Sequence, residues 1–257
     1  MRILVTNDDG VFAEGLQVLV RELAQVAEVL VIAPERQQSA TGHAITLHKP
    51  LRLEPVHMEH TIGAYASNGT PADCVILASL SDLPQPDMVV SGINAGANLG
   101  EEVLYSGTVS AAMEGALQEI PSISVSVCAY SDVLYEGAAC FARSLVTAVA
   151  GQWPLPPDTF FNVNLPNVPP DELKAPVLTR LGRRKYSNVL SKHVDPRGRP
   201  YYWFSGSPLE SDCGAGTDIQ ATQDGYVSIT PVHFDLTGDL EHGELPGFME
   251  RLGQPGG

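Results

Sequence analysis

The order of predicted secondary structure constrains the fold of this chain more than any other feature of its sequence. Through the first two thirds, short aliphatic and β-branched runs alternate with segments whose apolar residues recur at helical spacing. Strands and helices that alternate in this way form a mostly parallel sheet with helices on both faces. The sequence therefore predicts a Rossmann-like α/β fold.

The predicted elements can be placed along the chain by residue number. Strands are predicted over 2–6, 28–33, 45–54, 61–66, 87–91, 122–127 and 160–165. Helices are predicted over 15–27, 70–79, 108–119 and 135–151. Beyond residue 166 the periodicity fades, and we expect strand-like runs over 199–205 and 226–231 and a helix over 241–252.

This change of character predicts two regions. Residues 1–180 form the α/β core. Residues 181–257 form an extended hairpin arm, a returning strand and a C-terminal helix used in oligomerisation. Seven of the 15 Lys and Arg residues lie between 180 and 199, directly before the aromatic run 201–204. Because Arg and aromatic side chains are enriched at interfaces, we expect the arm to contact a second subunit in a homodimer or homotetramer.

Composition excludes several classes of protein. The chain has 257 residues and 44% hydrophobic content, and it contains no apolar run long enough to span a bilayer. The acidic pair at residue 8 leaves no room for a signal peptide, so we expect a cytoplasmic protein that binds no membrane. A net charge of −15 argues against binding to duplex nucleic acid. The four cysteines have no C-x-x-C spacing, which favours buried thiols over a zinc site or disulfides.

The tetrapeptide Asn-Asp-Asp-Gly at residues 7–10 follows the first predicted strand directly. Ligands of open α/β sheets bind at the carboxyl ends of the strands, and two adjacent carboxylates repel each other unless a cation lies between them. The pair Asp8 and Asp9 therefore indicates a magnesium or manganese site. The same tetrapeptide is also turn chemistry, in which Asp9 would cap the following helix.

A glycine-rich loop over 91–100 leads through Tyr105, Ser106, Gly107 and Thr108 into a predicted helix. A helix N-terminus attracts an anion through its unpaired N–H groups and its dipole, which suggests a phosphate site. The loop is neither a Walker A loop nor a Rossmann dinucleotide fingerprint.

Several segments together resemble a known family. They are Asn-Asp-Asp-Gly at 7–10, Gln-Ser-Ala-Thr-Gly-His-Ala-Ile-Thr at 38–46, Gly-Thr-Pro-Ala-Asp-Cys-Val at 69–75, Ser-Gly-Ile-Asn-Ala-Gly-Ala-Asn-Leu-Gly at 91–100, Tyr-Ser-Gly-Thr-Val-Ser-Ala-Ala at 105–112 and Gly-Tyr-Val-Ser-Ile-Thr-Pro at 225–231. In this order they resemble the SurE survival-protein nucleotidases, from Met1 to about Thr237. The resemblance implies a metal-dependent phosphomonoesterase that hydrolyses nucleoside 5′- and 3′-monophosphates and, in some members, short polyphosphate. It also implies dimers or tetramers with exchanged C-terminal arms.

The resemblance also implies roles for individual residues. One divalent cation per subunit, magnesium or manganese, would be held by Asp8, Asp9, Ser39 and Asn94. Substrate contacts are expected at Gly42, His43, Asn98, Ser106, Gly107 and Thr108. Catalytic roles are expected for Asp8, Asn98 and Ser106, with Asp8 acting as nucleophile, base or ligand alone. For His43, a capping or packing role is an open alternative to substrate contact.

Three other functions compete with this interpretation. A signalling receiver domain would need a phospho-accepting Asp after the third strand, and the segment 47–55 offers none. A dinucleotide or nucleotide-sugar binder would need a glycine fingerprint, which the loop over 91–100 does not provide. A non-catalytic nucleotide-binding sensor is the remaining alternative, although a sensor has no need of the four predicted metal ligands.

Overall fold

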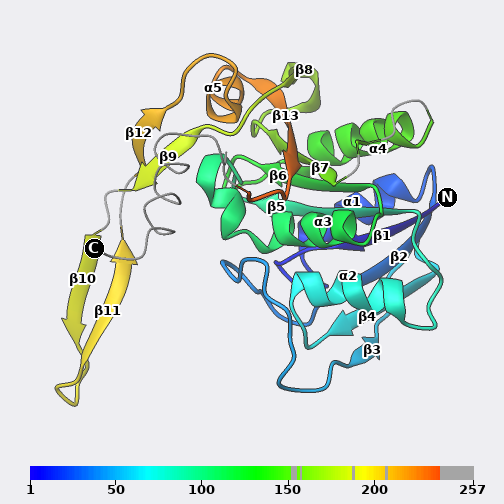
Figure 1. Cartoon of the computed structure of the whole chain (residues 1–257), viewed down its shortest axis with the longest axis horizontal. Helices are drawn as coiled ribbons and strands as arrows, with labels where there is room; N and C mark the ends of the chain where they lie inside the picture. Colours follow the sequence, from blue (N-terminus) through cyan, green and yellow to red (C-terminus); the bar gives the residue numbers. More distant parts are fainter. Residues whose placement is uncertain (152–154, 157, 187–188, 206–207, 238–257) are drawn as a thin grey trace, which may run out of the picture.

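The computed structural model describes residues 1–151, 155–156, 158–186, 189–205 and 208–237. A nine-stranded sheet runs through the molecule in the order β3-β4-β2-β1-β5-β6-β7-β13-β8 (Figure 1). Its strands are β1 Arg2–Thr6, β2 Glu28–Pro34, β3 Leu53–Pro55, β4 Gly63–Ser67, β5 Met88–Ala95, β6 Ser122–Val127, β7 Thr159–Leu165, β8 Lys174–Leu178 and β13 Tyr226–His233. The six strands from β4 to β7 are mutually parallel, as the alternation of strands and helices predicts.

Helices cover both faces of this sheet. They are α1 Glu14–Leu23, α2 Pro71–Leu80, α3 Gly107–Leu117, α4 Tyr135–Gly151 and α5 Asp218–Gln223, with short 3-10 turns η1 Gly100–Leu104 and η2 Pro170–Glu172. In β1, Ile3 and Val5 pack with α1 and α4 on one face, whereas Leu4 packs with α2 and α3 on the other. Because side chains alternate along a strand, a short apolar run such as β1 fills both cores at once.

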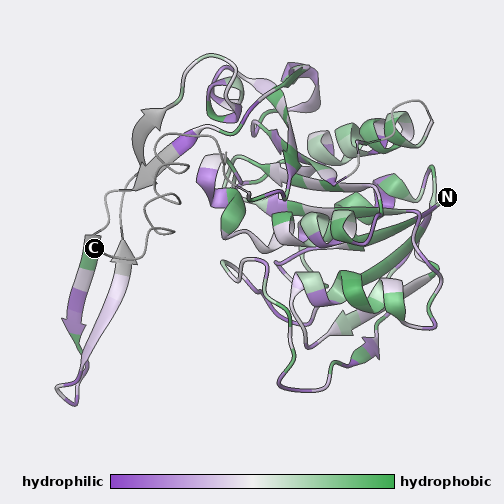
Figure 2. Cartoon of the chain, in the orientation of Figure 1, coloured by the Kyte–Doolittle hydropathy of each residue, from purple (hydrophilic) through white to green (hydrophobic). Residues whose placement is uncertain are grey.

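Figure 2 shows hydrophobic residues concentrated along the central strands and their covering helices. These interior strands bring their carboxyl ends to one edge of the sheet, which is where an open α/β fold binds its ligands. The predicted Rossmann-like α/β class is confirmed.

One predicted element is largely wrong. The segment 45–54 forms a strand only over Leu53–Pro55. The backbone N–H of Thr46 donates to Asp73 Oδ1 at 2.9 Å, and that of Arg52 donates to Asn68 Oδ1 at 2.9 Å. Backbone groups that bond to side chains in this way are not available for a strand ladder. The predicted helix over 241–252 lies outside the described residues.

The arm consists of two antiparallel pairs that stand apart from the nine-stranded sheet. Strand β9 Arg183–Tyr186 pairs with β12 Pro208–Asp212, and β10 Val189–Val194 pairs with β11 Pro200–Ser205. Figure 1 shows the β10–β11 hairpin reaching away from the body of the molecule. After the arm, β13 returns to the main sheet between β7 and β8. The division of the chain at residue 180 stays a prediction.

Candidate active site

A hollow of about 350 Å³ lies at the carboxyl ends of β1, β2 and β5, beside the start of α3. It is lined by Asp8, Asp9, Gln37, Ser39, Ala40, Asn94, Ala95, Gly96, Ala97, Asn98, Glu102, Tyr105, Ser106 and Tyr130. All four predicted metal ligands are among these residues. The structure thus brings three separate loops of the sequence to one place.

The turn that carries the acidic pair is closed by Asn7. Its Nδ2 donates to the Gly10 carbonyl oxygen at 2.9 Å, and its Oδ1 accepts from the Gly10 N–H at 3.1 Å. The Asn7 amide is therefore part of the turn, and Asp8 and Asp9 line the hollow. The turn chemistry is therefore supplied by Asn7, whereas Asp9 does not cap α1, whose N-cap residue is Ala13. The ligand site at Asp8 and Asp9 stays a prediction.

Asp8 lies against the N-terminus of α3. The Thr108 hydroxyl donates to Asp8 Oδ1, and an ideal Cβ built on Gly107 would lie 2.7 Å from Asp8 Cβ. Position 107 therefore has room only for glycine while Asp8 keeps its place. The favourable field at the helix start acts on the Asp8 carboxylate. Thr108 is fully buried, and the hydrogen bond from its hydroxyl group holds the Asp8 carboxylate in place.

The surroundings of Asp8 and Asp9 disfavour the charged form of both carboxyl groups, so the pKa of each is raised. Burial raises the pKa of Asp8, and the neighbouring Asp9 charge raises it further, against the lowering effect of the Thr108 hydrogen bond. Burial also raises the pKa of Asp9, although the Ala95 N–H and the Gln37 amide oppose this. Gln37 Nε2 lies 3.3 Å from Asp9 Oδ1. A cation in the hollow would relieve both costs.

Two neutral oxygen donors complete the predicted ligand set. The N–H of Gln38 donates to the Asp8 carbonyl oxygen at 2.7 Å, which ties the loop carrying Ser39 to the loop carrying the acidic pair. Asn94 Nδ2 donates to the Gly96 carbonyl oxygen at 2.8 Å, which leaves its Oδ1 as an acceptor. Within the described parts of the chain, no group of three or more His, Cys, Asp and Glu residues could hold a metal. A cation in this hollow would therefore combine two carboxylates with neutral oxygens.

Ser106 and Asn98, the two other predicted catalytic residues, also line the hollow. Ser106 caps α3, where its Oγ accepts from the Val109 N–H at 3.1 Å and its hydroxyl hydrogen can still be donated. Asn98 Nδ2 donates to Ser126 Oγ at 2.8 Å.

The backbone of Asn98 is hydrogen-bonded to two side chains of β7. Its carbonyl oxygen accepts from Asn162 Nδ2 at 2.8 Å and from Asn164 Nδ2 at 3.0 Å. Its N–H donates to Asn164 Oδ1 at 2.8 Å. Both β7 asparagines are fully buried, and their three hydrogen bonds hold Asn98 in place where it lines the hollow.

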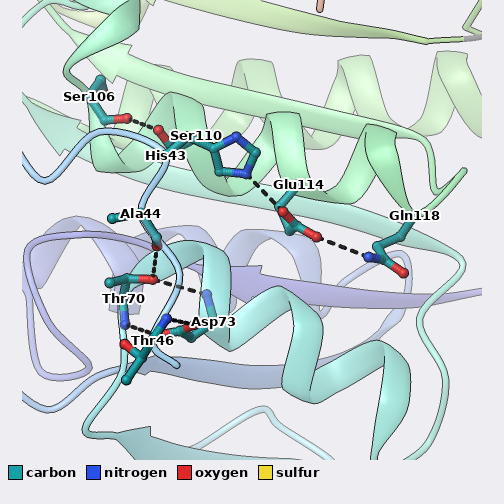
Figure 3. A network of polar contacts seen from close by, with 9 residues as sticks. All are labelled: His43, Ala44, Thr46, Thr70, Asp73, Ser106, Ser110, Glu114 and Gln118. Carbon is teal, nitrogen blue, oxygen red and sulfur yellow. Dashed lines mark hydrogen bonds and ion pairs between the residues drawn. The ribbon is translucent and has the colours of Figure 1, made fainter. Parts of the chain in front are cut away.

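Gly42 and His43 lie outside the residues that line the hollow. His43 Nε2 lies 2.8 Å from Glu114 Oε2 on α3, and Glu114 Oε1 accepts from Gln118 Nε2 at 2.9 Å (Figure 3). The Gly42 N–H donates to the Tyr105 carbonyl oxygen at 2.9 Å. The structure therefore shows a polar contact that ties His43 to α3, and the contact of His43 with substrate stays a prediction.

This contact affects the charge of Glu114. Burial alone would raise the pKa of Glu114, but the hydrogen bonds from His43 and Gln118 outweigh it and lower the pKa below its ordinary value. Thr70 donates its hydroxyl to the Ala44 carbonyl oxygen at 2.7 Å, farther along the same loop (Figure 3). The loop that follows Ser39 is thus fastened to both α3 and α2.

Sequence reasoning gave no role to four residues with polar side chains that line the hollow, namely Gln37, Glu102, Tyr105 and Tyr130. Glu102 is the most consequential because it adds a third carboxylate; its Oε2 also accepts from the Leu99 N–H at 3.2 Å. In the sequence, Glu102 lies between the two glycine-containing segments that flank the site, and this position could have identified it as a candidate. No Lys, Arg or His is among the described residues that line the hollow.

Two expectations from composition can be compared directly with the structure. All four cysteines are free thiols, but the expectation that they are buried is met only by Cys74, because Cys128, Cys140 and Cys213 are half-buried. Among the described residues, none of the helices combines the length and the apolar character needed to cross a bilayer.

Comparisons with known proteins agree with the resemblance seen in the sequence. The family model for survival protein SurE matches residues 3–188. A curated protein named 5′-nucleotidase SurE from Heliobacterium modesticaldum is 50% identical over 92% of this chain and 88% of its own length. One of the same name from Moorella thermoacetica is 49% identical over 98% and 97%. The crystal structure of the SurE protein from Aquifex aeolicus matches with a TM-score of 0.84 and 38% identity over 97% of this chain and 100% of that chain. This chain therefore belongs to the SurE family.

Proposed function

We propose that this chain is a metal-dependent phosphomonoesterase that hydrolyses nucleoside 5′-monophosphates to nucleoside and phosphate. One observation carries the proposal: the hollow is lined by three carboxylates and, among the described residues, by no basic side chain. A phosphate cannot bind beside uncompensated carboxylates unless a cation lies between them. The relatives named 5′-nucleotidase SurE support the same activity.

Asp8, Asp9, Ser39 and Asn94 are the residues that would hold the cation. Carboxylate, hydroxyl and amide oxygens suit magnesium or manganese, and the raised pKa values of both aspartates fit a site built around positive charge. When bound, such a cation polarises a phosphoryl oxygen and supports attack by water at phosphorus. The ligand set and the identity of the metal are part of the proposal.

The chain's own residues bind and orient the phosphate. Ser106 can donate its hydroxyl hydrogen from the start of α3, and Asn98 has a second amide hydrogen beyond the one given to Ser126. These donors suit the equatorial oxygens, on which negative charge is spread during phosphoryl transfer. Because Asn162 and Asn164 fix the Asn98 backbone, this donor is positioned before substrate arrives.

Phosphate release measured with and without EDTA tests the proposal. The wild-type chain should release phosphate from adenosine 5′-monophosphate, lose this activity in EDTA and regain it on addition of Mn²⁺ or Mg²⁺. Asp9→Asn should lower the rate by roughly a hundredfold or more, since it removes charge that holds the cation. Its free energy of unfolding in EDTA should not fall, because the substitution also removes the repulsion between Asp8 and Asp9.

Two outcomes would contradict the proposal. Activity that persists in EDTA would show that no cation is needed. Tight nucleotide binding without turnover would instead support a non-catalytic sensor, the alternative that the relatives do not favour. We further propose that the chain hydrolyses 3′-monophosphates and short polyphosphate. We also propose that it is located in the cytoplasm.

We also propose that the arm joins subunits into a homodimer or homotetramer. The β10–β11 hairpin pairs with no strand of the main sheet, and an isolated two-stranded hairpin is only marginally stable in water. Trp203 on β11 is 65% exposed, and Tyr202 and Leu190 are more than half exposed. A second subunit that packs on these side chains would bury them and stabilise the hairpin.

A further inference from the structure

A second hollow of about 310 Å³ adjoins the candidate active site. The two hollows share Ala97 and Tyr130 as lining residues. The second one lies beyond the carboxyl ends of β5, β6 and β7 and is also lined by the last turn of α5. Its lining residues are Ala97, Leu99, Cys128, Tyr130, Pro166, Asn167, Thr222 and Gln223.

The two hollows differ sharply in charge. The first contains the carboxylates of Asp8, Asp9 and Glu102, whereas none of the described residues that line the second is charged. A nucleoside monophosphate has the same division, because its phosphate is anionic and its base is a neutral aromatic ring. A phosphate held with a cation in the first hollow leaves the uncharged second hollow for the base.

Tyr130 stands at the junction of the two hollows. Its ring packs against Gly96, where an ideal Cβ would lie only 2.5 Å from Tyr130 Cε1, so any larger residue at position 96 would displace the ring. The residue is nevertheless 80% exposed, which leaves much of the ring surface available for contact. An exposed aromatic ring beside an uncharged hollow is a platform on which a nucleobase can stack.

The polar groups of the second hollow suggest little choice between bases. Asn167 already accepts from the Leu134 N–H at 2.8 Å and donates to the Asp132 carbonyl oxygen at 3.0 Å. The Thr222 hydroxyl donates to the Asp218 carbonyl oxygen at 3.0 Å. The exposed Gln223 amide can both donate and accept, so it can pair with the edge of any base.

We infer that the second hollow is the nucleobase subsite, in which the Tyr130 ring stacks on the base of a nucleotide whose phosphate lies in the first hollow. This inference rests on the proposed function and adds the part of the site that recognises the nucleoside. It predicts that Tyr130 contributes to the use of nucleotides but not to the use of phosphomonoesters that lack a base.

Kinetics of the full-length chain with Mn²⁺ test the subsite, with adenosine 5′-monophosphate compared against ribose 5-phosphate. Tyr130→Ala should lower kcat/KM for adenosine 5′-monophosphate about tenfold, mainly through KM, because stacking on an aromatic ring is lost. Its kcat/KM for ribose 5-phosphate should stay within about twofold of wild type. Tyr130→Phe keeps the ring and should behave as wild type with both substrates.

Tyr105→Ala is the matched control. Tyr105 is also a strongly exposed tyrosine, and it lines the first hollow but not the second. Its removal should leave the ratio of the two kcat/KM values unchanged. A selective loss of nucleotide hydrolysis in Tyr105→Ala, or an equal loss or no loss with both substrates in Tyr130→Ala, would overturn the inference.

Failure of the proposed function has a different signature, because the wild-type chain would then hydrolyse neither substrate. Calorimetric titration with the same two compounds decides the subsite in that case. Tighter binding of adenosine 5′-monophosphate than of ribose 5-phosphate, lost in Tyr130→Ala, supports it. Equal binding of both compounds, or no binding, refutes it.

Discussion

The hydroxyl group of Thr108 donates a hydrogen bond to Oδ1 of Asp8, a residue 100 positions earlier in the chain. Both side chains are buried, and the bond joins the loop after β1 to the first turn of α3. Thr108 thus holds in place a carboxylate that would bind the cation, and its own contact with substrate stays a prediction. The start of α3 thus contributes to the site in two ways: Ser106 lines the hollow, and Thr108 positions Asp8.

Removal of this hydroxyl should weaken both stability and activity. We expect Thr108→Val to lower the free energy of unfolding in EDTA by about 1–3 kcal/mol, because a hydrogen bond to a carboxylate is lost in a buried place. Thr108→Ser keeps the hydroxyl and should retain most of the stability. Urea denaturation of the three proteins provides the measurement, and equal stability of the Val and Ser variants would show that the bond contributes nothing.

Gly107→Ala should damage the site through steric displacement alone. The added methyl group would meet Asp8 Cβ at 2.7 Å and Oδ2 at 2.9 Å, so Asp8 must move. We expect kcat/KM to fall by roughly tenfold to a hundredfold, as a small misplacement of a site residue can cost that much.

Gly151→Ala is the control for this experiment. It makes the same change in α4, where nothing lies within 4 Å of the added methyl group. Its activity should equal that of wild type. Full activity in Gly107→Ala would mean that the position of Asp8 does not matter to the reaction.

The pair of His43 and Glu114 predicts a pH-dependent contribution to stability. The pKa of Glu114 is lowered in the folded chain, so the charged carboxylate stabilises the fold above the ordinary pKa of about 4.5. This stabilisation is lost as the pH falls through the lowered pKa. Glu114→Gln should therefore be less stable than wild type near neutral pH, and the difference should shrink in acid.

Urea denaturation at several pH values between 3 and 7 measures this difference. The exposed Glu119 provides a matched substitution, and Glu119→Gln should change stability little at any of these pH values. A difference between wild type and Glu114→Gln that stays constant with pH would refute the charge-based explanation.

Loss of the arm should change the oligomeric state. We expect light scattering to show a dimer or tetramer for the intact chain and a monomer when residues 185–203 are replaced by a short Gly/Ser linker. Circular dichroism of the variant should still show the folded α/β core, since β13 and the central strands lie outside the replaced segment. A monomeric intact chain, or an unchanged oligomer in the variant, would contradict the prediction.

The sequence alone determined the architecture and the acidic centre of the site. Short β-branched runs that alternate with helical segments predict a parallel sheet, because local periodicity is set by neighbouring residues. The pair Asp8 and Asp9 is visible for a similar reason, since it directly follows a strand whose carboxyl end must lie at the ligand-binding edge. Ser39, Asn94, Asn98 and Ser106 came from motifs, and the structure gathers them in the same hollow.

Only the tertiary structure decided what the remaining residues contact. Thr108 bonds to Asp8 and His43 bonds to Glu114, and these partners are separated by 100 and 71 positions in the sequence. Glu102 and Tyr130 enter the site because the turn η1 and the loop after β6 fold beside the acidic pair. No local pattern encodes such contacts, because they depend on how distant segments pack against one sheet.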